Sequence, residues 1–497
     1  MTKRKRADVP ALVALGRSSY VSKRGIAQLA NTFRLDGVPE TTSRTAQYRA
    51  RKSVCKTQTP YGTLVQTIPL TCADGGTIDV AVQNPLAMLY HVASASQRFA
   101  TVMRAGLDAM PCTSTTPWSV ILYQDGVDPS DGLSNNHSRK SNVFYWSFLE
   151  LGMKALGDER NWFPVALGRY NSLVKADGSI TQLASKACSL FWNRSGHDLE
   201  LTGANIKLHG DQHITTIFAK MGCVLADEPA IKEVLACKGH AGTKPCVLCM
   251  NAVAHAHSGA EGLHRHHDYP VSMVELDITK FKQHTNSSIR HVVERLHSKK
   301  GSVTAEAFDT LEQLYGFNYN VYNLVLHERV RLNVVSSLMW DWCHCFVCDG
   351  IADVEFGLFM KVMTKNKTLS TYAELQTYVE GWALPKTLPS VARLFAEAPA
   401  RNNLRKESFT SSASEFLTLI PILVRYISVV CAGRGRCMPY VMSMTAALEV
   451  IELLQSIKAG PGVVAPEVLR NAIMKHLTLF RDAYGISHLR RIRVCIR

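Results

Sequence analysis

Residues 118–125 read WSVILYQD and residues 214–227 read ITTIFAKMGCVLAD, two apolar runs that each end in an aspartate. Runs of this kind predict strands whose apolar side chains fill a sheet. Asp125 and Asp227 would then lie at carboxyl ends of strands, where open α/β sheets place their ligands. Each is also a good turn or helix-start residue, because Gly126 follows the first and Glu228-Pro229 the second. Their joint placement favours a functional pair.

Other periodic segments complete the same pattern. Apolar strands are predicted at 142–151 (NVFYWSFLEL) and 162–169 (WFPVALGR), and helices at 180–192 and from Pro229. The order is three strands, a helix, a fourth strand and a helix. This order predicts a mixed α/β domain, and it is the order of elements in the ribonuclease H-like fold.

The length and composition predict several globular units. A chain of 497 residues with 46% hydrophobic and 20% charged residues exceeds one usual core. The fourteen cysteines are too sparse for a disulfide scaffold, and MTKRKRADVP lacks the apolar stretch of a secretory signal. We expect an intracellular, reducing compartment. The most apolar stretch, Phe416 to Ala432, is interrupted by Pro421 and Arg425, so no membrane partner is expected.

Positive charge is concentrated at the start of the chain. Residues 1–60 contain thirteen Lys or Arg and three acidic residues, which is +10 of the total +15. A helix from Ser22 to Phe33, a break at Gly37 to Pro39 and a basic helix from Thr42 or Ser43 to Val54 resemble a helix-turn-helix outline. An amphipathic helical pair with an exposed basic face is the alternative. The predicted DNA contacts on the second helix are Arg44, Arg49, Arg51 and Lys52.

Composition and pattern divide the chain into six predicted parts. They are a basic module at 1–57, a linking subdomain at 58–117, the first part of the α/β core at 118–236, a Cys/His insertion at 237–276, a helical insertion at 277–405, and C-terminal helices at 406–497 that complete the core. Arg139 and Lys140, between the first two strands, are further candidates for phosphate contact, with a solvated hairpin as the simpler account. Tyr145, Trp146 and Phe148 are interpreted as strand core rather than as base-stacking platforms.

Cys246 and Cys249 form the strongest local motif, CVLC within GTKPCVLCMN. A Cys-x-x-Cys loop presents two thiolates to one tetrahedral Zn²⁺. His264 and His266 are the expected remaining ligands, with His267 or Cys237 as alternatives; a redox pair or buried cysteines are the competing interpretations. Cys345 and Cys348 with His344 form a weaker second half-site, on a segment where cysteines are more often core.

Three ordered segments carry a family resemblance: LYQDGVDPSDGLSNNHSRKSNVFYWSFLELG, VLADEPAIKEVLACKGHAGTKPCVLCMN and MWDWCHCFVCDGIADVE. Together they resemble DDE transposases of the CACTA type and their Plavaka and KDZ relatives. The resemblance covers about residues 118–430. It implies a ribonuclease H-like mixed sheet, a zinc-loop insertion, a mainly helical C-terminal half and a small helical N-terminal module.

The resemblance also implies an activity and its residues. Asp125 and Asp227 match the first two Mg²⁺-binding or Mn²⁺-binding acids of such enzymes. Glu415 is the best candidate for the third acid and Glu355 is its rival, although either fits an ordinary acid in a helix's first turn. Asp341 and His344 match an Asp-x-x-His motif that supports the catalytic core without supplying one of its acids.

The expected function follows from this assignment. It is transposon-derived DNA cutting and joining by two-metal-ion phosphodiester chemistry, on transposon ends and target DNA, in the nucleus. Lys3 to Arg6 supply a candidate import signal. One alternative is a catalytically inactive, domesticated DNA-binding protein that keeps the fold, and another is a structure-specific nuclease on the same fold. A homo-oligomer is left open.

Overall fold

The structure of the chain is a computed structural model. It describes residues 43–127, 140–194, 196–239, 242–254, 270–348, 350–365, 371–385, 390–435, 437–460 and 462–492. The chain forms two compact units, residues 1–59 and 60–497. In the first, helix α3 (Arg44–Cys55) begins at Ser43, whose hydroxyl accepts a hydrogen bond from the Ala46 amide at 3.1 Å. Residues 22–42, where the first predicted helix falls, lie outside the described residues.

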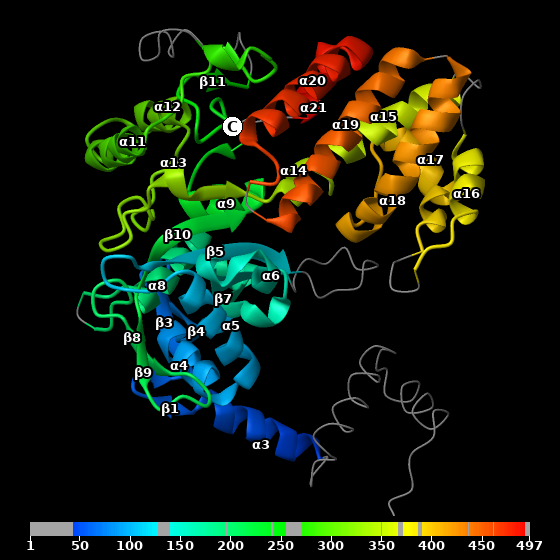
Figure 1. The fold of residues 1–497 in the computed structure, drawn as a ribbon. Coiled ribbons are helices and arrows are strands. Elements are labelled where there is room, and N and C mark those ends of the chain that lie inside the picture. The colour runs from blue at the N-terminus through cyan, green and yellow to red at the C-terminus, as the bar shows by residue number, and fades with distance from the viewer. Residues whose placement is uncertain are drawn as a thin grey trace, which may run out of the picture. The chain divides into compact units, whose positions relative to one another are not determined.

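The second unit is built on a seven-stranded mixed sheet (Figure 1). Its spatial order is β13-β10-β5-β6-β7-β4-β3. The strands run as follows: β3 Val65–Thr71, β4 Thr77–Gln83, β5 Trp118–Val127, β6 Ser141–Phe148, β7 Phe163–Arg169, β10 Ala219–Ala226 and β13 Leu338–Trp340. Short strands β8 (Ala204–Lys207) and β9 (Ile214–Ile217) form a separate hairpin.

Strand directions divide the sheet into two regions. Each neighbouring pair in the series β5-β6-β7-β4-β3 is antiparallel. On the other side of β5, β10 pairs with β5 in parallel and β13 pairs with β10 in parallel. A parallel strand needs a long crossover connection. Before β10 that connection contains α8 (Ser179–Phe191), and between β10 and β13 it contains α9 (Glu228–Leu235), α11 (Asn286–Lys299), α12 (Ala305–Tyr315) and α13 (Val334–Ser337).

One face of the sheet carries the main hydrophobic core. Trp118, Val120 and Leu122 of β5 point into it, as do Val224 and Ala226 of β10. Helices α4 (Pro85–Ala95), α5 (Gln97–Ala109), α8 and α9 pack there. Because side chains alternate along a strand, Ile121, Tyr123 and Asp125 point to the opposite face.

Trp146 and Phe148 are buried in this core, as predicted, whereas Tyr145 points to the opposite face and is only partly buried. The predicted strands at 118–125 and 162–169 and the helix at 180–192 correspond closely to β5, β7 and α8. The predicted strand 214–227 is divided at Phe218 between β9 and β10. Residues 58–117 do not stand apart, because β3 and β4 extend the sheet and α4 and α5 cover it.

The C-terminal half is mainly helical, as predicted. It has a hydrophobic core of its own around Phe356, Phe395 and Phe416. Its helices α15 to α20 gather in a bundle in Figure 1. The α-helices of this half are α14 (Trp342–Phe346), α15 (Ile351–Lys365), α16 (Tyr372–Glu380), α17 (Glu397–Lys406), α18 (Ala413–Tyr426), α19 (Met438–Ser456), α20 (Pro466–Tyr484) and α21 (Ile486–Ile492).

Two stretches of this helical half, Ala413–Arg434 and Met438–Ala459, are long and apolar enough to cross a membrane by length and composition. Half of each apolar window is buried inside the protein. Core helices of soluble proteins pass the same test, so these stretches are weak evidence for a membrane.

Candidate active site at three strand ends

Three aspartates lie at the carboxyl ends of three neighbouring parallel strands. Asp125 lies near the end of β5, while Asp227 and Asp341 each follow the last residue of β10 and β13. Leu225 pairs with Tyr123 and Ala226 with Trp340, so continuing the register places Asp227 beside Asp125 and Asp341 beside Asp227. The Asp341 amide donates to the Ala226 carbonyl oxygen at 3.0 Å, which extends this pairing. Neighbouring strands are about 4.8 Å apart.

The three carboxylates also share one face of the sheet. Asp125 is two residues after Tyr123, Asp227 two after Leu225 and Asp341 two after Met339. Those three preceding residues are paired with one another across the strands, and all point away from the main core. The structure therefore gathers three acids from distant sequence positions at one edge.

Two of the three acids also start helices. Asp227 is the N-cap of α9, and its Oδ1 accepts the Ala230 amide at 2.8 Å. Asp341 caps α14 in the same way, with Oδ1 accepting the Cys343 amide at 2.8 Å. A carboxylate oxygen has two lone pairs, so capping leaves each group with acceptor capacity.

Tyr123 and His344 lie within the electrostatic reach of all three acids. Burial, followed by the charges of Asp125, Asp341 and Asp227 and a hydrogen bond to Asp125, raises the pKa of Tyr123 well above its usual value. The hydrogen bond from His344 Nδ1 to Asp341 Oδ2, 2.8 Å long, raises the pKa of His344 together with the charges of the three aspartates.

The pKa of Asp341 moves in the opposite direction. Burial would raise it, but hydrogen bonds from His344 and from the backbone amides of Cys343 and His344 outweigh burial and lower it. Both shifts favour the charged forms, the Asp341 carboxylate and the protonated His344 imidazole. When it is protonated, His344 partly offsets the negative charge of the three acids.

An all-carboxylate set is the ligand chemistry that Mg²⁺ and Mn²⁺ prefer. In the part of the chain that the structure describes, no group of three or more His, Cys, Asp or Glu side chains is arranged to hold a metal. The side chains of Asp227 and Asp341 turn toward their own helices instead. Metal binding would require a side-chain rotation at a site whose backbone positions already converge.

The two glutamates favoured by the sequence are engaged elsewhere. Glu415 is the third residue of α18, where it closes a capping box with Ser412 and pairs with Arg393. Glu355 is fully buried on α15, where it accepts hydrogen bonds from Ser443 at 2.6 Å and pairs with His476 at 2.5 Å. Both have structural roles among the C-terminal helices.

The sequence analysis did not count Asp341 among the acids, whereas the structure brings it to the same sheet edge as Asp125 and Asp227. The sequence signal was present: an apolar run, Leu338 to Trp340, ends in an aspartate that caps a helix, just as the run before Asp227 does. Only three residues of the run form a strand, which is too short for an apolar run to indicate β structure.

No known protein family matches the chain. No curated protein matches it either. The assignment of the site therefore depends on the geometry described above and on the sequence motifs.

The predicted DNA-binding residues fall in two places. Arg44, Arg49 and Lys52 are exposed on α3, where Arg51 also lies within the helix. Lys140 immediately precedes β6 and lies beside Gly126 of β5: a Cβ on Gly126 would lie 3.2 Å from the Lys140 Cε. A cation is thus held next to the residue that follows Asp125. Arg139 lies outside the described residues.

The predicted zinc ligands are only partly described. Cys246 and Cys249 are buried, and His264, His266 and His267 lie outside the described residues. Cys246 is disulfide-bonded in the structure, a state in which its sulfur is not a thiolate ligand. Cys237 is also buried, and burial raises its pKa to about 12. The zinc site stays a prediction.

Purified under reducing conditions, the chain should contain about one bound zinc, because reduction restores the thiolates that the metal requires. Cys249→Ser should lose it and lower the melting temperature. Elemental analysis and thermal melting measure both effects. Cys188→Ala, at a buried thiol on α8, is the matched control and should keep the metal; full zinc content in Cys249→Ser would exclude Cys249 as a ligand.

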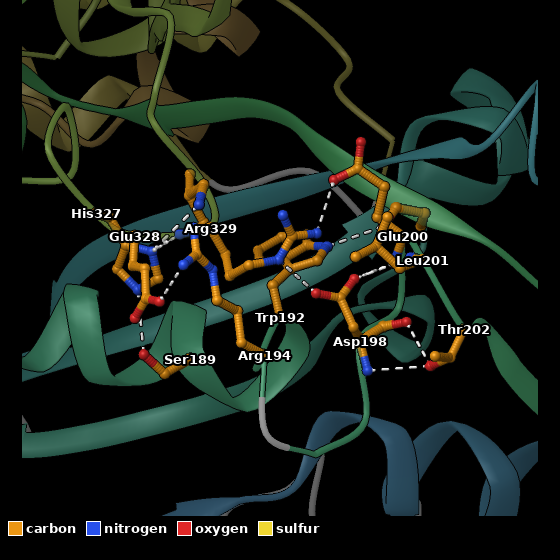
Figure 2. Close-up of polar contacts among 12 residues, drawn as sticks. Ser189, Trp192, Arg194, Asp198, Glu200, Leu201, Thr202, His327, Glu328 and Arg329 are labelled. Carbon is orange, nitrogen blue, oxygen red and sulfur yellow. Dashed lines mark hydrogen bonds and ion pairs between the residues drawn. The ribbon is translucent and has the colours of Figure 1, made fainter.

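A polar network fixes the segment that leads to β13. Figure 2 shows His327, Glu328 and Arg329 between Ser189 of α8 and the turn at Asp198. Arg329 Nε lies 2.6 Å from Asp198 Oδ2, and both side chains are largely buried. The Asp198 Oδ1 accepts the backbone amides of Glu200 and Leu201. This network anchors the segment at Arg329, which precedes β13 in the chain; Asp341 follows β13 directly.

Removing one partner of this pair should destabilise the protein. We expect Arg329→Met to lower the free energy of unfolding by about 2 kcal/mol, because Asp198 keeps its amide donors but loses its buried counter-charge. Chemical denaturation measures the change. Arg401→Met, which removes an exposed ion pair with Glu397, is the control and should change stability by less than about 1 kcal/mol. Equal effects would show that the network does not stabilise the fold.

His327 should make stability depend on pH. Its Nδ1 accepts the backbone amides of Arg329 and Val330, each at 3.2 Å, so the neutral form with hydrogen on Nε2 is selected. Burial is the main cause that lowers its pKa below the usual 6.5. Neutral His327 therefore makes its full contribution to the free energy of unfolding above pH 6.5, and this contribution is lost as pH falls through the folded-state pKa. Chemical denaturation at several pH values between 7 and 5 gives the slope of the free energy of unfolding against pH. This slope should be smaller in His327→Asn than in wild type, and an equal slope would contradict the prediction.

Proposed function

We propose that the chain is a transposon-derived DDE transposase with a ribonuclease H-like core, which cuts and joins DNA. The observation that carries the proposal is the convergence of Asp125, Asp227 and Asp341 on one face at the ends of adjacent parallel strands. The order β7-β6-β5-β10-β13, with β6 antiparallel to its neighbours, supports the fold assignment because it is the arrangement expected of that core.

In this proposal, two divalent cations held by the three aspartates would activate the attacking oxygen and stabilise the leaving one. Asp125 and Asp227 would be shared ligands, and Asp341 would take the third position in place of Glu415. His344 would orient Asp341 through its Nδ1 hydrogen bond. Lys140 and the basic residues of α3 would neutralise DNA phosphates.

The alternative is an inactive DNA-binding descendant with the same fold. It is favoured by the local hydrogen bonds that already occupy the Asp227 and Asp341 carboxylates, and by the lack of a preformed metal group among the described residues. In that case the basic residues would bind DNA without a metal requirement, with the steep salt dependence of phosphate contacts.

One experiment separates the two. Purified chain incubated with supercoiled DNA and Mg²⁺ or Mn²⁺ should nick or join it, and the product should disappear with a chelator. Asp125→Asn and Asp227→Asn, assayed beside it, should each be inactive. DNA binding without a product in either metal would support the inactive descendant, and unchanged activity in both variants would exclude the mechanism.

A further inference from the structure

The face of the sheet that carries the three acids also carries a row of apolar and aromatic side chains. Met339 pairs with Leu225, Leu225 with Tyr123 and Tyr123 with Tyr145 across four adjacent strands. In the neighbouring row, Val143 pairs with Leu167 beside Asp125. We call Met339, Leu225, Tyr123, Tyr145 and Leu167 the shelf.

The shelf is incompletely covered. Leu167 is 52% exposed and Met339 is 50% exposed, while Tyr123, Tyr145 and Leu225 are partly buried. The opposite face of the same strands is fully packed by helices. Partly exposed apolar and aromatic side chains that line one sheet face beside charged groups are a candidate binding surface.

The tyrosines of the shelf are held in place by other aromatic rings. The rings of Tyr123 and Tyr145 are nearly parallel, with an interplanar angle of 26° and centroids 6.2 Å apart. Trp162 meets Tyr123 edge-on, with centroids 6.1 Å apart. Little conformational entropy would therefore be lost when a planar ligand stacks here.

The charges around the shelf favour a polyanion with planar groups. Arg169 is exposed two residues after Leu167, which places it on the same face beyond the row of acids. Two divalent ions would more than neutralise the three aspartates. A strand of nucleic acid offers phosphates to these cations and, where its bases are unpaired, ring faces to the tyrosines.

We propose that the shelf binds unpaired bases of the DNA strand next to the cleaved phosphate, with Tyr145 as the main stacking residue. The inference rests on the proposed function for its ligand, but it concerns binding and requires no cleavage. Paired bases remain stacked in the duplex and leave no ring face for the shelf. The shelf thus selects a strand that has been opened at the site.

The test is the affinity of the full chain for a short oligothymidylate, measured by fluorescence anisotropy both with and without Mg²⁺. Tyr145→Leu should weaken binding by roughly 5- to 150-fold, the range of one lost base stack. Tyr145→Phe keeps the ring and should bind like wild type. Plots of affinity against salt should be parallel for wild type and Tyr145→Leu, because no phosphate contact is removed. Duplex affinity should be unchanged.

Equal affinity of Tyr145→Leu and wild type for oligothymidylate would overturn the inference. So would a change from oligomer to monomer in Leu167→Asp, which would mean that a second copy of the chain covers the shelf. If Tyr145→Leu does not fold, iodouracil-substituted oligothymidylate should photocross-link wild-type protein at the peptides containing Tyr123 or Tyr145; cross-links confined to other peptides would refute it.

The outcome is independent of cleavage activity. If binding depends on Tyr145 but the chain never cuts DNA, the proposed stacking site is supported and the transposase function is excluded. If the chain cuts DNA and Tyr145→Leu changes neither cleavage nor the affinity for oligothymidylate, the transposase function is supported and the stacking site is excluded.

Discussion

Asp341→Asn should reduce metal-dependent DNA cleavage by roughly 10³-fold or more, as should Asp125→Asn and Asp227→Asn. The expectation follows from the proposed mechanism, in which the three carboxylates would hold metal ions that supply several kcal/mol of transition-state stabilisation. Asn is a helix cap as good as Asp, so α9 and α14 should still form. Initial cleavage rates at saturating Mg²⁺, together with circular dichroism, separate lost chemistry from lost folding.

Glu415→Gln and Glu355→Gln are the matched controls. Glu415 closes a capping box, and Glu355 is sealed among α15, α19 and α20, so neither substitution should change the cleavage rate at a temperature where the variant is folded. Loss of cleavage in Glu415→Gln combined with normal cleavage in Asp341→Asn would return the third acid to the position favoured by the sequence. That result would also show that the helical half moves against the sheet.

His476→Leu should lower the free energy of unfolding by about 3–5 kcal/mol, because it leaves the Glu355 carboxylate buried with Ser443 as its remaining donor. Both partners of the pair are fully buried, so water cannot replace the lost imidazole. Urea denaturation, followed by tryptophan fluorescence and circular dichroism, measures the change.

The double variant Glu355→Met/His476→Leu tests the cause. Replacing a buried pair with apolar side chains of similar size is often neutral, so the double variant should recover most of the stability lost in His476→Leu. The difference between the double change and the sum of the single changes gives the coupling energy. Additive losses would show that the histidine contributes by packing and that the carboxyl–imidazole pair does not matter.

The strands that could be predicted from the sequence are those long enough to be fully buried. Trp118 to Leu122 and Phe163 to Ala166 have the continuous apolar pattern of a central strand, and the structure places them there. The edge strand β13 could not be predicted in this way, since three residues show no period. Its place depends on pairing with β10, more than one hundred residues earlier, which no local pattern reports.

The site was predictable to the same extent. Asp125 and Asp227 were recognisable because each ends a long strand. Asp341 was recognised only as a motif, and Glu415 was preferred because a resemblance placed the third acid on a downstream helix. The capping box that engages Glu415 was itself readable, as Ser412 stands three residues before it. The sequence alone did not indicate which of two chemically reasonable acids, Asp341 or Glu415, lies beside the sheet.

Asp227 and Asp341 both cap helices, and under the proposed function they would also hold metal, which has a consequence for the history of such a chain. The helix N-cap requires a side-chain oxygen that accepts a backbone hydrogen bond, and Asn supplies this oxygen as well as Asp does. A single change of Asp to Asn would therefore remove a charge without removing a helix. Such a variant would lose catalytic activity without unfolding, so an inactive descendant could persist as a stable protein. At these two positions, selection for the negative charge would be the feature that distinguishes an active gene from an inactive one.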